Sequence, residues 1–130
     1  MRARDEAILA ITPTVDHTGL EGSFILATGA IVTSATTAPL PIGCILDGFT
    51  IKQKDSVALP NFGGTLKVKL SATPGAVVFG SYLVLDGTTL GAVKLDPGTG
   101  TPRIQVARAL EAGAANELIE AYLVEPQILA

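Results

Sequence analysis

Strict alternation of apolar and polar residues marks one segment of the chain as a β-strand. Leu66, Val68 and Leu70 alternate with Lys67 and Lys69. Because successive side chains of a strand point to opposite faces, the three apolar residues share one face and the two lysines share the other. The pattern predicts a strand with one buried face and one solvated face.

Other short runs rich in β-branched and aliphatic residues are also expected to form strands. These runs are residues 23–26, 30–33, 49–52, 82–85 and 90–95. The last two flank Asp86 and Gly87, a pair that provides the positive φ angles of tight turns, and together they predict a hairpin.

Turn-forming residues separate these runs at regular intervals, at residues 47–48, 61–64, 73–75, 86–87 and 96–100. Short strands between regularly spaced turns favour an all-β barrel or sandwich of antiparallel hairpins. Residues 35–41 contain two prolines, which exclude a central strand and predict an extended loop.

The C-terminal third fits two structures. Residues 103–123 are rich in Ala, Leu and Glu, which favour a helix with Val106 and Leu110 on one face. Gly113 and Asn116 interrupt that helix. The alternative is a hairpin in which residues 103–110 return as residues 117–124, and we favour it, although local propensity alone leaves the two structures nearly equal.

The length of 130 residues favours one domain. We expect a single β domain over residues 1–130, with an N-terminal arm at residues 1–11 and a mobile C-terminal end at residues 125–130. The apolar stretch at residues 7–11 is too short for a signal peptide, and no run approaches the roughly 20 apolar residues of a membrane span. We therefore expect the protein to be made and used without crossing a membrane.

Composition narrows the classes of partner. Apolar residues make up 48% of the chain and charged residues 16%, below the roughly 25% typical of soluble domains. Low charge on a small protein indicates either a large buried fraction or an apolar surface that contacts partners, and we favour oligomerisation or docking. The net charge of −3 disfavours nucleic acid, whose binding requires positive charge to displace counterions.

Residues that carry catalytic or metal chemistry are scarce. His17 is the only histidine and is expected to be an exposed loop residue, whereas Cys44, the only cysteine, is expected to be a small buried core residue. One Cys and one His do not supply the usual zinc ligands. We expect no enzyme activity, no catalytic residue, no metal and no cofactor.

Four lysines form two pairs with a spacing of two residues: Lys52 with Lys54, and Lys67 with Lys69. One interpretation is a basic patch that meets an acidic partner. The other, which we favour, is a solvated sheet face that prevents edge-to-edge aggregation.

A series of motifs follows in order between residues 39 and 124. They are Pro-Leu-Pro-Ile-Gly-Cys-Ile-Leu-Asp-Gly at residues 39–48, Asp-Ser-Val-Ala-Leu at 55–59, Gly-Gly-Thr-Leu-Lys-Val-Lys-Leu at 63–70, Tyr-Leu-Val-Leu-Asp at 82–86 and a longer stretch at 106–120. This order resembles a family of small tailed-phage proteins that decorate, or cement, the capsid. The chain departs from the family pattern at Ala107, which precedes Arg108 where a glycine is common.

The resemblance implies a small β-barrel or β-tulip-like domain, often trimeric, on the outside of a mature phage head. It implies a major capsid protein and other copies of the chain as partners, with no nucleic acid, membrane or small-molecule substrate. The expected location is the capsid surface of the virion, with assembly in the host cytoplasm. Other interpretations are another phage structural part, such as a tail, spike-base or shell component, or a small ligand-binding or enzymatic β-barrel.

Capsid contact is expected in the N-terminal arm or in the proline-rich loop. The candidate contact residues are Arg2, Arg4, Ile8, Ile11, Pro39, Leu40 and Pro41.

Overall fold

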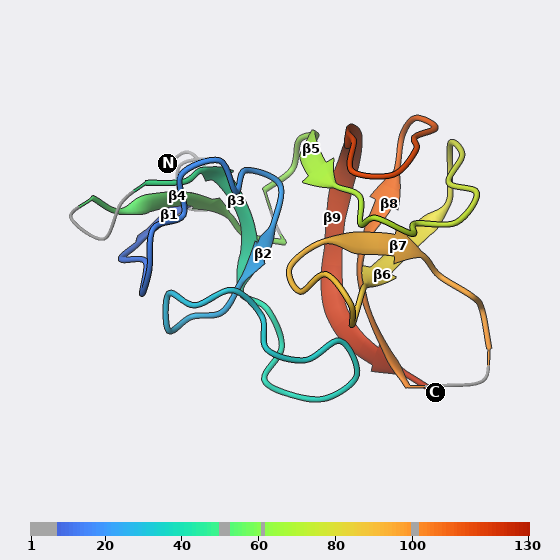
Figure 1. The fold of residues 1–130 in the computed structure, drawn as a ribbon, viewed down its shortest axis with the longest axis horizontal. Helices are drawn as coiled ribbons and strands as arrows, with labels where there is room; N and C mark the ends of the chain where they lie inside the picture. The colour runs from blue at the N-terminus through green and yellow to red at the C-terminus, as the bar shows by residue number, and fades with distance from the viewer. Residues whose placement is uncertain (1–7, 50–52, 61, 100–101) are drawn as a thin grey trace.

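The computed structural model describes residues 8–49, 53–60, 62–99 and 102–130 (Figure 1). Within this part of the chain there is no helix, and the strands form two antiparallel sheets, one of them curled into a half-barrel. The predicted all-β fold of short antiparallel strands and hairpins is therefore confirmed.

The N-terminal sheet has four strands in the order β1-β4-β3-β2. Their bounds are β1 (Ile8–Ile11), β2 (Phe24–Ile25), β3 (Gly43–Asp47) and β4 (Asp55–Ala58). The strand β1 falls inside the expected N-terminal arm: its residues pair with β4 over its whole length, and residues 1–7 lie outside the described residues. The loop predicted at residues 35–41 contains no strand.

The C-terminal sheet has five strands in the order β5-β9-β8-β6-β7. Their bounds are β5 (Leu66–Lys69), β6 (Tyr82–Leu85), β7 (Val93–Leu95), β8 (Arg103–Ala109) and β9 (Leu118–Leu129). The predicted hairpin of β6 and β7 is present. Residues 103–124 also form a hairpin, and the helix alternative is wrong.

The C-terminal end differs from the sequence-based expectation. Residues 125–130 were expected to be mobile, but β9 continues to Leu129 and pairs with the start of β8, where Arg103 lies opposite Leu129 and Ile104 opposite Ile128. The Arg103 Nη1 group also donates a hydrogen bond to the carbonyl of Ala130 at 3.0 Å. The paired strand therefore replaces the expected free end.

The two sheets share one apolar core. Phe24, Cys44 and Ala58 of the N-terminal sheet belong to the same buried cluster as Val68 and Leu83 of the C-terminal sheet. The predicted burial of Cys44 is confirmed. Burial raises the pKa of its thiol, because an apolar environment disfavours the thiolate.

A second apolar cluster covers the outer face of the N-terminal sheet. It contains Ile11, Ile25, Ile45 and Val57, and the last three are next in sequence to Phe24, Cys44 and Ala58 of the shared core. Loop residues such as Leu20 pack over these side chains. The strand period of two thus explains why both faces of β2, β3 and β4 are largely buried, whereas Ile8, Leu9 and Ala10 of β1 are exposed.

Candidate interaction surfaces

The N-terminal candidates differ in their exposure. Arg2 and Arg4 lie outside the described residues. Ile8, at the start of β1, leaves 38% of its surface exposed. Ile11 is buried in the outer cluster of the N-terminal sheet, because the pleat of β1 directs it against Val57 and its neighbours. Burial removes Ile11 from the residues that a partner reaches directly.

The proline-rich loop ends beside the start of β1. Pro39 and Leu40 are exposed, whereas Pro41 is buried and lines a hollow of about 210 Å³. Ile8 lies opposite Ala58, and Ala58 lies opposite Cys44, three residues after Pro41. The register therefore brings two candidate segments that are distant in sequence to the same end of the N-terminal sheet.

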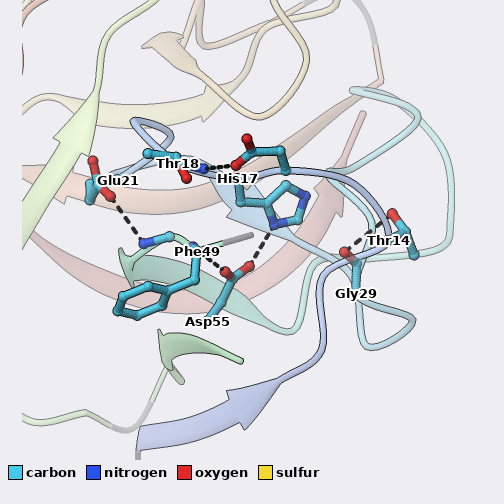
Figure 2. Close-up of polar contacts among 9 residues, drawn as sticks. Thr14, His17, Thr18, Glu21, Gly29, Phe49 and Asp55 are labelled. Atoms are coloured by element: carbon cyan, nitrogen blue, oxygen red, sulfur yellow. Dashed lines mark hydrogen bonds and ion pairs between the residues drawn. The ribbon is translucent and has the colours of Figure 1, made fainter. Parts of the chain in front are cut away.

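His17 is fully buried, so the expectation of an exposed loop histidine is wrong. Its Nδ1 atom lies 2.5 Å from Oδ2 of Asp55, which is also fully buried (Figure 2). The backbone N–H of Phe49 donates to the other carboxylate oxygen of Asp55 at 2.9 Å. A buried carboxylate needs such donors, and His17 supplies one by folding over the outer face of the sheet.

The pair of His17 and Asp55 holds two loops together. The N–H of His17 donates to the carbonyl of Phe49 at 2.9 Å. Glu21 Oε2 accepts the N–H of Gly48 at 3.0 Å (Figure 2). Full burial of both side chains separates the pair from any substrate in solution, so its role is structural. His17 Nε2 is buried and finds no hydrogen-bond partner among the described residues.

One signal for this pair was present in the sequence. Asp55 begins a strand whose next apolar residues, Val57 and Ala58, are both buried. A carboxylate in that position requires a buried donor. The sequence does not show that the donor is His17, which lies 38 residues away.

Of the two lysines of β5, Lys67 is exposed and Lys69 is half-buried. Lys67 Nζ lies 3.1 Å from Glu111 and 3.5 Å from Glu120, and all three side chains are well exposed. The hydrogen bond with Glu111 raises the pKa of Lys67, and the N–H of Glu120 together with Lys67 lowers the pKa of Glu111. Lys54 is exposed, and Lys52 lies outside the described residues.

Sequence reasoning missed an exposed apolar turn before β6. Phe79 leaves 72% of its surface exposed and Val78 leaves 56%. The N–H of Ser81 donates to the carbonyl of Val78 at 3.1 Å, and Gly80 has a φ of +90°, as the third position of a type II turn requires. An aromatic residue directly before a glycine was the available signal.

An apolar hollow opens at the edge of the C-terminal sheet where β5 begins. Its volume is about 500 Å³, and Pro60, Phe62, Thr65, Tyr122 and Leu123 contribute to its lining. The described residues contain no group of three or more His, Cys, Asp or Glu side chains that would hold a metal ion.

No protein-family model matches the sequence, and no curated protein matches it. Among the described residues, no helix has the length and apolar character needed to span a membrane.

Proposed function

We propose that the protein is a phage capsid decoration protein, which binds the outer surface of the mature head and stabilises it by bridging capsid subunits. The proposal assigns it no enzymatic activity and no cofactor. The motifs that resemble the decoration family support it, because they fall in order on the strands of the body. They fall on the loop before β3 and β3 itself, then on β4, β5, β6 and the hairpin of β8 and β9.

The observation that carries the proposal is the exposed apolar end of the N-terminal sheet. Ile8 and Leu40 are exposed there, close to the hollow lined by Pro41. Since the inner strands β3 and β4 are packed on both faces, these residues are presented by a body that resists deformation. Such a body stabilises an expanded shell by binding it more tightly than the unexpanded shell.

The test is co-sedimentation with mature heads that lack the protein. We expect the wild-type protein to pellet with these heads, and negative-stain images to show surface knobs only when it is present. We expect Ile8→Ser combined with Leu40→Ser to weaken binding. The matched control is Val15→Ser, since Val15 is an exposed aliphatic residue of the loop after β1.

Wild-type protein that remains in the supernatant would contradict the proposal. Copurification with tails instead of heads would favour another phage structural part. The resemblance also leads us to propose a homotrimer, which sedimentation equilibrium of the purified chain measures directly, and a monomer at all concentrations would contradict this part.

A further inference from the structure

Three side chains form a row across the outer face of the C-terminal sheet. Tyr82 of β6 lies opposite Arg108 of β8, and Arg108 lies opposite Tyr122 of β9. The residues next to them in sequence, such as Leu83 and Ala107, face the core. The strand period therefore directs all three side chains of the row away from the core.

Arg108 connects this row to the exposed turn. Its guanidinium carbon lies 4.8 Å from the centre of the Tyr82 ring, a cation–π contact, and its Nη1 donates to the Tyr122 hydroxyl at 3.5 Å. Its Nε donates to the carbonyl of Gly80 at 3.0 Å. Phe79 directly precedes Gly80 in this turn, and we call Phe79, Tyr82, Arg108 and Tyr122 together the aromatic strip.

The turn that presents Phe79 is held firmly. The N–H of Gly80 donates to the carbonyl of Ala109 at 2.8 Å, and the N–H of Val78 donates to the Ser81 hydroxyl at 3.1 Å. A side chain on an ordered turn loses less conformational freedom on binding than one on a flexible loop. Phe79 is therefore suited to act as an anchor.

The composition of the strip is that of the centre of a protein–protein interface. Tyr, Phe and Arg are enriched at such centres, whereas Lys, Glu and Ser are depleted. The chain has only two tyrosines and four phenylalanines, and both tyrosines and one phenylalanine lie in the strip.

The charge of the strip indicates the chemistry of the partner. Arg103 pairs with Asp96, and Lys67 pairs with two glutamates, but Arg108 forms no ion pair with any described residue. An arginine whose neighbours are aromatic rings remains able to bind a carboxylate through two parallel hydrogen bonds. The matching surface carries a carboxylate beside an apolar recess that accepts a phenyl ring.

We propose that the aromatic strip is a second docking surface, which binds an apolar recess flanked by an acidic residue on the capsid protein. This inference rests on the proposed function. The strip lies on the C-terminal sheet, whereas the first contact lies at the end of the N-terminal sheet, so one copy would engage the shell at two places. Two linked contacts bind more tightly than either contact alone.

The test measures binding of the whole protein to mature heads that lack it, by co-sedimentation over a range of protein concentrations. We expect Phe79→Ser and Arg108→Gln each to weaken binding at least tenfold. Arg108→Gln should also reduce the salt dependence of binding, because it removes the charge that pairs with the carboxylate. Leu90→Ser is the matched control: Leu90 is an exposed apolar residue in the turn at the opposite end of β6, and its replacement should leave affinity unchanged.

Circular dichroism and thermal unfolding establish that each variant is folded before binding is compared, and Phe79→Leu provides a milder second variant. Wild-type affinity in both Phe79→Ser and Arg108→Gln would overturn the inference and leave the proposed function intact. Failure of the wild-type protein to bind heads would overturn both. Dissociation of an oligomer by Phe79→Ser would show that a second copy of the chain covers the strip, and would also overturn the inference.

Discussion

Asp55 is the residue on which the loops over the N-terminal sheet depend. Its two carboxylate oxygens accept hydrogen bonds from His17 and from the N–H of Phe49. Removing the carboxylate leaves the buried His17 and the partly buried N–H of Phe49 without this acceptor, and breaking a buried pair costs about 3 kcal/mol or more. We therefore expect Asp55→Ala to lower the free energy of unfolding by about 3 kcal/mol, measured by urea denaturation.

Asp47→Ala is the control for this prediction, because Asp47 is exposed at the end of β3. Exposed substitutions away from special features usually change stability by about 0.5 kcal/mol or less. A loss for Asp55→Ala no larger than that of Asp47→Ala would show that the buried pair is not needed for folding.

Single residues also show why the sequence predicts Cys44 correctly and His17 incorrectly. Cys44 has apolar neighbours in the chain, and these are enough to indicate burial. The local conformation around His17 is indeed a turn: Thr18 donates to Asp16, and Leu20 donates to the carbonyl of His17. The burial of that turn depends on Asp55, and no local pattern contains this contact.

At the scale of elements, Asp96 joins the end of β7 to the start of β8. Its Oδ1 accepts from the N–H of Gly98 at 2.8 Å and from Arg103 Nε at 2.5 Å, and its Oδ2 accepts from Gln105 Nε2 at 3.1 Å. Burial alone raises the pKa of Asp96, but these hydrogen bonds outweigh burial and hold the pKa below its ordinary value of 3.8.

A carboxyl group whose pKa is lower in the folded than in the unfolded state stabilises the fold at pH values above its unfolded pKa. This stabilisation is lost as the pH falls through the folded pKa. We expect Asp96→Asn to lower Tm clearly near neutral pH, with the gap from wild type closing as the pH falls below about 4. Thermal unfolding over a pH series measures the gap. A gap of constant size at every pH would contradict the assignment.

The last part of β9 is a second element whose role can be tested. Its pairing with β8 covers Ile104, which is fully buried, and each lost ladder hydrogen bond costs about 1 kcal/mol. We expect removal of residues 125–130 to lower the free energy of unfolding by at least about 2 kcal/mol. Removal of Ala130 alone is the control. Equal stability of the two shortened chains would show that residues 125–129 do not stabilise the fold, as expected for a mobile end.

The alternation of apolar and polar residues predicted the strands that have one solvent-exposed face. It did not predict strands in which the alternation is absent or interrupted. The residues of β5 alternate, and their burial follows that pattern. The four residues of β1 are all apolar, so they show no period and were assigned to an arm. Pro126 lies where the ladder of β8 and β9 shifts register between Gln105 and Ala107, and a bulge tolerates a proline within a strand.

At the scale of the whole molecule, each of the two proposed docking surfaces draws on segments far apart in the chain. Ile8 and the proline-rich loop were named from the sequence as candidate contacts with a capsid. Only the strand register shows that they share one end of a sheet. The aromatic strip draws on β6, β8 and β9. Each of its residues is unremarkable in its local sequence, so the strip was not predictable before the pairing was known.

The core that joins the sheets leads to a prediction about cooperativity. Phe24 and Ala58 from one sheet and Leu83 from the other belong to one buried cluster, so exposing either sheet removes packing from both. Small domains with a shared core usually unfold in a single transition. We therefore expect the two sheets to unfold together.

The chain contains a natural probe for each sheet. His17, the only histidine, lies over the N-terminal sheet and gives separate imidazole proton signals by NMR. Tyr82 and Tyr122, the only tyrosines, lie on the C-terminal sheet, and their fluorescence follows that sheet. In urea, the His17 signals and the tyrosine fluorescence should change with one common midpoint. Midpoints that differ beyond error would mean that one sheet unfolds while the other stays folded. Two sheets that unfold separately could not hold the two proposed contacts on a shell at a fixed distance.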